Sequence, residues 1–150
     1  MNQNPTDDTR YVASDGTVTP LFRESFRRVL FDYVETARFW APRRNKSLNE
    51  FAIREASIVG SCLRGIDNSD LDLLIIADKI DQEDYRFFKQ VLSTIYYSHR
   101  SKDSAIDVYV RPYDEYPERE SLSVTCQVRN IIDEANSGLG FTKKVCDRNE

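Results

Sequence analysis

The sequence predicts an α/β (α+β) domain, a small mixed β-sheet with helices packed on it. Two short β-branched, apolar runs flank a polar turn between Gly60 and Asp70, as expected of two neighbouring strands. A helical pattern then precedes a third strand pattern at residues 105–111. Helically spaced apolar residues between Phe22 and Trp40 add a helix to cover the sheet.

The chain of 150 residues is long enough for one domain with a sizeable core. Residues 1–18 are mostly polar and are expected to form a flexible N-terminal tail. Residues 19–146 are expected to form the single domain, and residues 147–150 a polar C-terminal end. No internal linker or repeat interrupts this arrangement.

The first helix is expected to begin at Thr19-Pro20, because proline suits the first helical position, and to end at Pro42. Trp40, at the end of its apolar stripe, is interpreted as packing and not as a ligand contact. A cluster of basic residues follows at positions 43–46, formed by Arg43, Arg44 and Lys46, and is interpreted as a solvated loop. Ser47 and Glu50 have capping-box spacing, which predicts a helical turn before the first strand.

Strands are expected at residues 56–59 and 70–77, and the second is apolar on both faces after Asp72. Asp81 and Asp84 begin the next helix, whose apolar positions continue to Tyr96. His99, the sole histidine, is interpreted as a charge partner at the end of that helix and receives no catalytic role.

The third strand alternates: Ile106, Val108 and Val110 face one way, whereas Asp107, Tyr109 and Arg111 face the other. A last helix is expected from Leu122 to Ser137-Gly138, followed by a short edge strand within residues 140–145.

Charge and cysteine usage narrow the functional classes. The net charge of −4 offers no general attraction for nucleic acid, so direct nucleic-acid binding is not expected. The three cysteines lack metal-ligand spacing and are expected to be reduced thiols in the cytoplasm. No apolar run approaches the roughly 20 residues of a membrane span, and no hydrophobic signal region begins the chain.

The turn between the first two strands carries the chemistry. Glycines at positions 60 and 65 let backbone amides approach a bulky anion. Asp70 and Asp72 stand two residues apart, so in a strand both carboxylates leave the same face. Carboxylates that bind a hard cation, beside amides that bind phosphate oxygens, are what a magnesium–triphosphate complex requires.

Gly60-Ser61, eight residues, and then Asp70-x-Asp72 between apolar residues resemble the signature of the nucleotidyltransferase superfamily typified by DNA polymerase beta. The gap is slightly shorter than is usual there. With Arg64-Gly65 and the run from Ser69 to Ile75, the motif is most similar to the minimal nucleotidyltransferases of bacteria and archaea. Asp107, between apolar residues on the third strand, matches the further carboxylate of the superfamily pattern.

The resemblance implies a nucleotidyltransferase fold and two Mg²⁺ ions held by Asp70, Asp72 and Asp107. It implies that Gly60, Ser61, Arg64 and Gly65 contact the phosphates of ATP or another nucleoside triphosphate; Arg64 reads equally well as a solvated turn residue. Cys62, within the same loop, is interpreted as a small turn residue.

The implied activity is transfer of a nucleoside monophosphate, AMP from ATP in the first place, to a hydroxyl acceptor. In the minimal group the acceptor is frequently a tyrosine on a helical toxin, which an antitoxin AMPylates. Two other classes stay open: a non-catalytic module that binds nucleotide or neutralises a toxin by binding, and a transferase acting on RNA ends or a small molecule.

Overall fold

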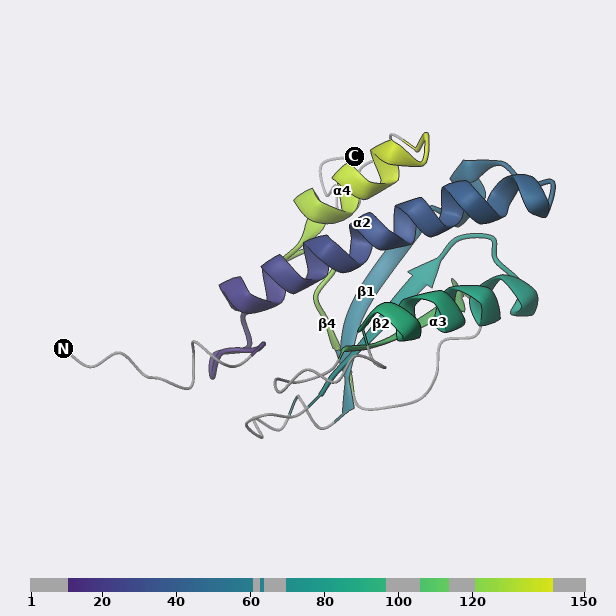
Figure 1. The fold of residues 1–150 in the computed structure, drawn as a ribbon. Helices are drawn as coiled ribbons and strands as arrows, with labels where there is room; N and C mark the ends of the chain where they lie inside the picture. The colour runs from purple at the N-terminus through teal and green to yellow at the C-terminus, as the bar shows by residue number, and fades with distance from the viewer. Residues whose placement is uncertain (1–10, 61–62, 64–69, 97–105, 114–120, 142–150) are drawn as a thin grey trace.

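The computed structural model describes residues 11–60, 63, 70–96, 106–113 and 121–141, and it confirms the mixed α/β class. Three α-helices and one four-stranded sheet make up the described part of the chain (Figure 1). The elements are α2 (Pro20–Arg43), a 3₁₀ turn η1 (Leu48–Phe51), β1 (Ile53–Val59), β2 (Leu71–Ala77), α3 (Gln82–Tyr96), β3 (Ile106–Pro112), β4 (Ser121–Ser123) and α4 (Arg129–Gly138).

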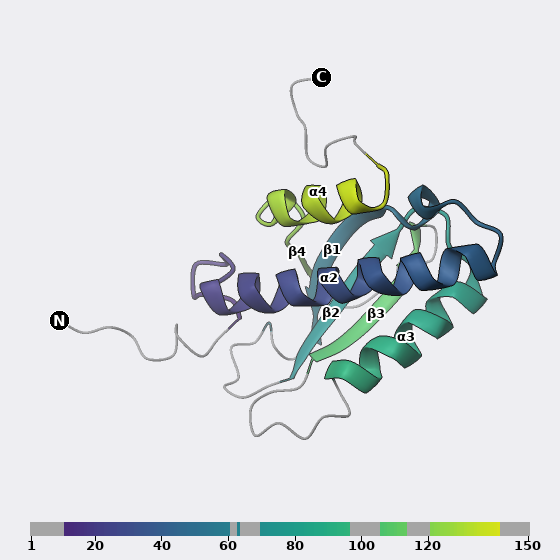
Figure 2. The same cartoon turned by 45° about the horizontal axis from the view of Figure 1, so that its top comes forward.

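The sheet is mixed, with strand order β3-β2-β1-β4. β1 runs antiparallel to both β2 and β4, whereas β2 and β3 are parallel. The parallel pair follows from the chain order, because α3 carries the chain back between β2 and β3. All three helices lie on one face of the sheet (Figure 2). This arrangement leaves the opposite face without a described helix.

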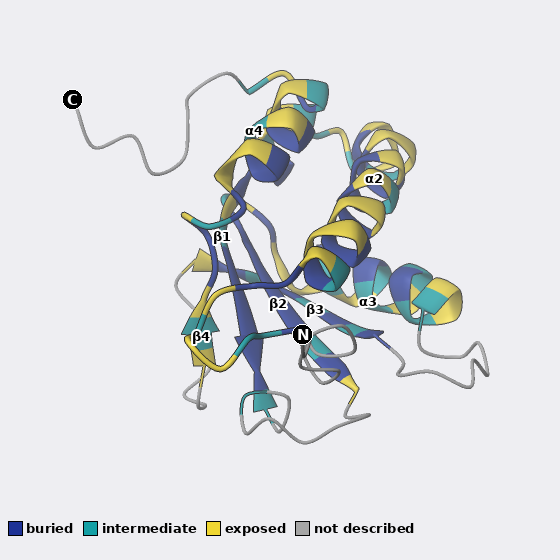
Figure 3. Ribbon diagram, turned by 90° about the vertical axis from the view of Figure 1, so that its left-hand side faces the viewer, coloured by how far each residue is buried: buried dark blue, intermediate teal, exposed yellow. Residues whose placement is uncertain are grey.

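The main core lies between the helices and the sheet. On β2, Leu71, Leu73 and Ile75 point into this core, and on α2 Phe22 and Phe26 pack with them without any solvent exposure. The alternate β2 residues Leu74 and Ile76 form a second, smaller cluster with Val59. β2 is therefore buried on both faces over most of its length, as its continuous apolar run predicts (Figure 3).

Helix α2 begins as its sequence predicts and ends one residue later. The Thr19 hydroxyl accepts a hydrogen bond from the Phe22 N–H at 3.2 Å, so Thr19 caps the helix ahead of Pro20. Pro42 lies inside the last turn instead of ending the helix. Near a helix end a proline removes only the bond that its own N–H would make, and Arg44 N–H still reaches the Trp40 carbonyl at 3.2 Å.

The packed part of the chain begins before Thr19. Tyr11 and Val18 are buried in the main core, and an isolated antiparallel bridge joins Val12 to Val18. The Val18 N–H donates to the Gln127 side chain at 2.8 Å. The expectation of a flexible tail over residues 1–18 is therefore wrong from Tyr11 onward. A small number of apolar residues on either side of a turn is enough to anchor this short segment on the core. Residues 1–10 lie outside the described ranges.

The C-terminal part also differs from expectation. Residues 121–123 form β4, and the last helix begins at Arg129 and not at Leu122. Leu122 and Val124 alternate as in a strand, and the Val124 N–H donates to the Ala56 carbonyl at 2.9 Å. Cys126 is disulfide-bonded, which contradicts the expectation of a reduced thiol at this position. The edge strand expected within residues 140–145 falls almost entirely outside the described residues.

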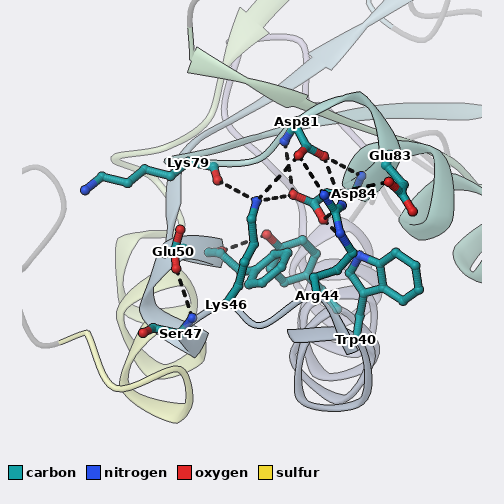
Figure 4. A network of polar contacts seen from close by, with 11 residues as sticks. Trp40, Arg44, Lys46, Ser47, Glu50, Lys79, Asp81, Glu83 and Asp84 are labelled. Atoms are coloured by element: carbon teal, nitrogen blue, oxygen red, sulfur yellow. Dashed lines mark hydrogen bonds and ion pairs between the residues drawn. The ribbon is translucent and has the colours of Figure 1, made fainter. Parts of the chain in front are cut away.

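The basic segment after α2 is not a solvated loop. Asp84, which is 0% exposed, accepts hydrogen bonds from Trp40 Nε1 (2.9 Å), Arg44 (2.6 Å), Lys46 (2.5 Å) and the Asp81 N–H (3.0 Å) (Figure 4). A buried carboxylate is costly unless it is paired, and the two cations balance its charge. We call these five residues the Asp84 network; it joins the end of α2 to the start of α3.

Within this network Asp81 makes stability depend on pH. The hydrogen bond from Arg44 holds the pKa of the Asp81 carboxyl well below its usual range. A carboxyl with a lowered folded-state pKa stabilises the protein above its unfolded-state pKa, and this contribution is lost as the pH falls through the folded-state value.

We therefore expect wild type to exceed Asp81→Asn in unfolding free energy at pH 7, and the difference to shrink as the pH falls below about 4. Because the Asp81 side chain is half exposed, screening limits the difference to roughly 0.5 kcal/mol. Urea unfolding at a series of pH values measures it, with Glu134→Gln, an exposed carboxylate away from Arg44, as the control. A difference independent of pH would contradict the role of Asp81.

No helix in the described part of the chain is long and apolar enough to cross a membrane.

Candidate functional site

The sheet register brings the predicted site residues to one level. Asp72 on β2 and Asp107 on β3 are partners in the parallel ladder. On the other side of β2, Val59 of β1 is the antiparallel partner of Asp72, and Gly60 follows it directly. Gly60, Asp72 and Asp107 therefore lie across three neighbouring strands at one end of the sheet, in spite of their separation in the sequence.

Both carboxylates project from the face that no described helix covers. Leu71 and Leu73, on either side of Asp72, point into the main core under the helices. Ile106 and Val108 flank Asp107 in the same way. Since neighbouring side chains alternate along a strand, the aspartates share the opposite face. Asp70 lies just before β2 and is exposed.

Gly60 has a backbone conformation that suits glycine. Its φ of 85° lies in the left-handed region, which a residue with a Cβ adopts only with strain. The chain thus leaves β1 through a turn that other side chains disfavour. The remaining predicted phosphate contacts, Ser61, Arg64 and Gly65, lie outside the described residues, as do Cys62 and His99, so their roles stay predictions.

Asp107 has two partners that the sequence did not reveal. The Lys89 ammonium of α3 pairs with Oδ1, and the Tyr109 hydroxyl donates to Oδ2 at 2.7 Å. The side chain of Asp107 is only 15% exposed, so its charge needs a partner. The contact with Tyr109 could be predicted from the sequence, since Tyr109 lies two residues after Asp107 on the same strand face. The contact with Lys89 could not, because lysine is ordinary on a helix.

The three acids do not converge on a metal in this arrangement. Across residues 11–60, 70–96, 106–113 and 121–141, no three acidic, histidine or cysteine side chains are grouped closely enough to hold an ion. At Asp107 the ammonium of Lys89 supplies the positive charge that a metal would otherwise bring. The Asp107 side chain is largely buried, and Lys89 balances its charge.

The donor set nevertheless fits magnesium in kind. Carboxylate oxygens are the ligands that this hard cation prefers, and Asp72 and Asp107 lie side by side on adjacent strands. For Asp107 to bind a metal, Lys89 has to move aside. Asp72 and Asp107 are thus suitable ligands, with Asp107 held by a competing cation.

Hollows lined by the described residues include two of similar size. One, with a volume of about 360 Å³, lies beside Asp107 and is lined by Tyr85, Arg86, Lys89, Gln90 and Arg111; we call it the α3–β3 hollow. The other, of about 340 Å³, lies between α2 and α4 and has an apolar floor that includes Leu30 and Ile131. Only the first adjoins a predicted site residue.

Comparison of the chain with protein-family models, with curated proteins and with solved structures finds no match.

Proposed function

We propose that this chain is a metal-dependent nucleotidyltransferase that moves AMP from ATP, or the corresponding group of another nucleoside triphosphate, to a hydroxyl. One observation carries the proposal: Gly60, Asp72 and Asp107 lie across three neighbouring strands at the same level of the sheet. In the motif, the position of Gly60 contacts phosphate and the positions of Asp72 and Asp107 bind metal. Asp70, exposed just before β2, stands at the same end of the sheet.

In this proposal Asp70, Asp72 and Asp107, the last with Lys89 moved aside, would hold two Mg²⁺ ions, whose charge would offset that of the triphosphate and activate the acceptor hydroxyl. The backbone around Gly60, with Ser61, Arg64 and Gly65, contacts the phosphates. The acceptor oxygen forms a bond to the α-phosphorus while the bond to the β-phosphate oxygen breaks. Pyrophosphate leaves, and the hydroxyl proton passes to water.

We place the acceptor hydroxyl on a partner protein, as in antitoxins that AMPylate a helical toxin. A polyanionic acceptor such as RNA is usually held by several Lys and Arg side chains, and the net charge of this chain is −4. The basic segment at residues 43–46 is not available to bind RNA, because Arg44 and Lys46 form ion pairs with Asp84. A partner protein brings its own surface and presents its own hydroxyl.

A second function is favoured by the Lys89–Asp107 ion pair. A chain that binds nucleotide without turning it over, and neutralises a partner by contact, has no need to release Asp107. The two functions differ in their products. Incubation with α-labelled ATP and magnesium, together with either host lysate or an RNA pool, separates them. Label in a discrete protein band supports transfer to protein, label in RNA overturns the acceptor, and no label favours the binding module.

Nucleotide binding is expected to require divalent metal, because a triphosphate beside unscreened carboxylates is repelled. Calorimetric titration with ATP should give binding in the presence of magnesium and at least about tenfold weaker binding with a chelator. Asp78→Asn, which changes an acid at the other end of β2, is the matched control and should keep the metal dependence. Equal affinity in both conditions would count against the site.

A further inference from the structure

We propose that the α3–β3 hollow is an acceptor-side site that binds a carboxylate of the partner protein, close to the hydroxyl that receives the nucleotide. The placement relative to the acceptor rests on the proposed function; the affinity of the hollow for an anion does not. Its wall carries three cationic side chains, Arg86, Lys89 and Arg111, beside Tyr85 and Gln90.

The charge around the hollow is locally positive on a chain of net negative charge. Asp107 is the carboxylate paired with Lys89, whereas Arg111 donates to its own strand, at the Val110 carbonyl, at 2.9 Å. A carboxylate that enters the hollow can share Lys89 with Asp107 and take further hydrogen bonds from the arginines. Guanidinium groups suit carboxylates because they bind both oxygens at once.

The aromatic rings position these cations. The Arg111 guanidinium lies 4.7 Å from the Tyr85 ring centroid, and the Lys89 ammonium lies 3.9 Å from that of Tyr109. Such contacts hold a cation over the ring and leave its other N–H groups available. The contact with Arg111 also occupies one face of the Tyr85 ring, on which a nucleic-acid base would otherwise stack. The hollow therefore favours an isolated anionic side chain over a stacked nucleotide.

The hollow lies where the acceptor would bind, and not where the nucleotide would bind. The strand order places β2 between β3 and β1, so Asp72 and Asp107 lie between the hollow and Gly60. If the phosphates bind at Gly60, the hollow lies on the far side of the carboxylates. In phosphoryl transfer the attacking and leaving oxygens are roughly in line, on opposite sides of the phosphorus. The acceptor therefore approaches from the side of the hollow.

The dimensions suggest the spacing within the acceptor. The hollow extends along β3 from Lys89, beside Asp107, to Arg111, four residues further along the strand. Four strand residues span roughly 13 Å, so an extended partner would place its acidic residue no more than about four positions from the acceptor.

The test measures peptide binding by fluorescence anisotropy, with the full chain and without ATP or magnesium. One labelled peptide carries Tyr with Glu three and four positions away, and the other carries Gln at those positions. We expect the Glu peptide to bind about tenfold more tightly, and Lys89→Met and Arg111→Met each to remove most of that preference. Lys79→Met, an exposed lysine outside the hollow, is the matched control and should retain it.

Asp107→Asn supplies a change of opposite sign: it releases Lys89 and removes a competing charge, so the Glu peptide should bind more tightly. Circular dichroism confirms that each variant is folded. Equal binding of the two peptides would overturn the proposal, and so would tighter binding of a labelled oligonucleotide of matched charge. Because metal–ATP binding is measured separately, a wild-type chain that binds ATP but does not prefer the Glu peptide refutes this inference and leaves the proposed function standing.

Discussion

Asp72→Asn is expected to reduce nucleotidyl transfer by roughly a hundred- to a thousandfold while leaving the fold intact. In the proposed function the substitution removes a metal-binding charge at nearly constant volume, and metal contacts contribute several kcal/mol of transition-state stabilisation. Asp72 is only half buried, and its strand neighbours Leu71 and Leu73 hold β2 in the core. Release of labelled pyrophosphate measures the rate, and thermal unfolding measures stability.

The matched control for this experiment is Asp78→Asn. Asp78 follows the other end of β2 and pairs with Arg54 at 2.9 Å, far along the strand from Asp72. Transfer by this variant should stay near the wild-type rate. A near-normal rate for Asp72→Asn, or an equal loss for both variants, would show that the metal site is assigned wrongly.

Asp84→Ala is expected to lower the free energy of unfolding by about 3–5 kcal/mol, which is the typical cost of removing one partner of a buried ion pair. The change leaves Arg44 and Lys46, whose side chains are 20% and 17% exposed, without their fully buried counter-charge. It also removes the acceptor of the Trp40 Nε1–H. Urea unfolding at pH 7 measures the loss.

Glu134→Ala serves as the control for Asp84. Glu134 pairs with Arg27 at 3.1 Å, and both side chains are largely exposed, so its removal should change stability by no more than about 0.5 kcal/mol. If Asp84→Ala lowered the free energy of unfolding no more than this control, the Asp84 network would not contribute to stability.

The elements that the sequence predicts well are those with a strong local period or a single local cause. Ile106, Val108 and Val110 alternate along β3 and all face the main core. Thr19 caps α2, and the Ser47–Glu50 capping box is present. Each of these depends on residues close together in the sequence, where spacing alone carries the information.

The features that could not be predicted depend on distant residues. The partners of Asp84 come from the end of α2 and the loop after it, and nothing in the local sequence distinguishes a paired Arg44 from a solvated one. Likewise, Lys89 meets Asp107 only because α3 packs beside β3. The sequence does not predict β4, because three residues are too few to establish a period and its pairing with β1 is a long-range contact.

The pairing of β4 with β1 has a consequence for the growing chain. Ser57–Val59 form one edge of the sheet until Ser121–Ser123 pair with them, so while the ribosome makes the intervening residues this apolar edge has no strand beside it. Uncovered strand edges are templates for pairing with another chain. Nascent polypeptides that stop before β4 should therefore bind chaperones and aggregate more readily than those that include it, which makes Ser121–Ser123 decisive for soluble yield.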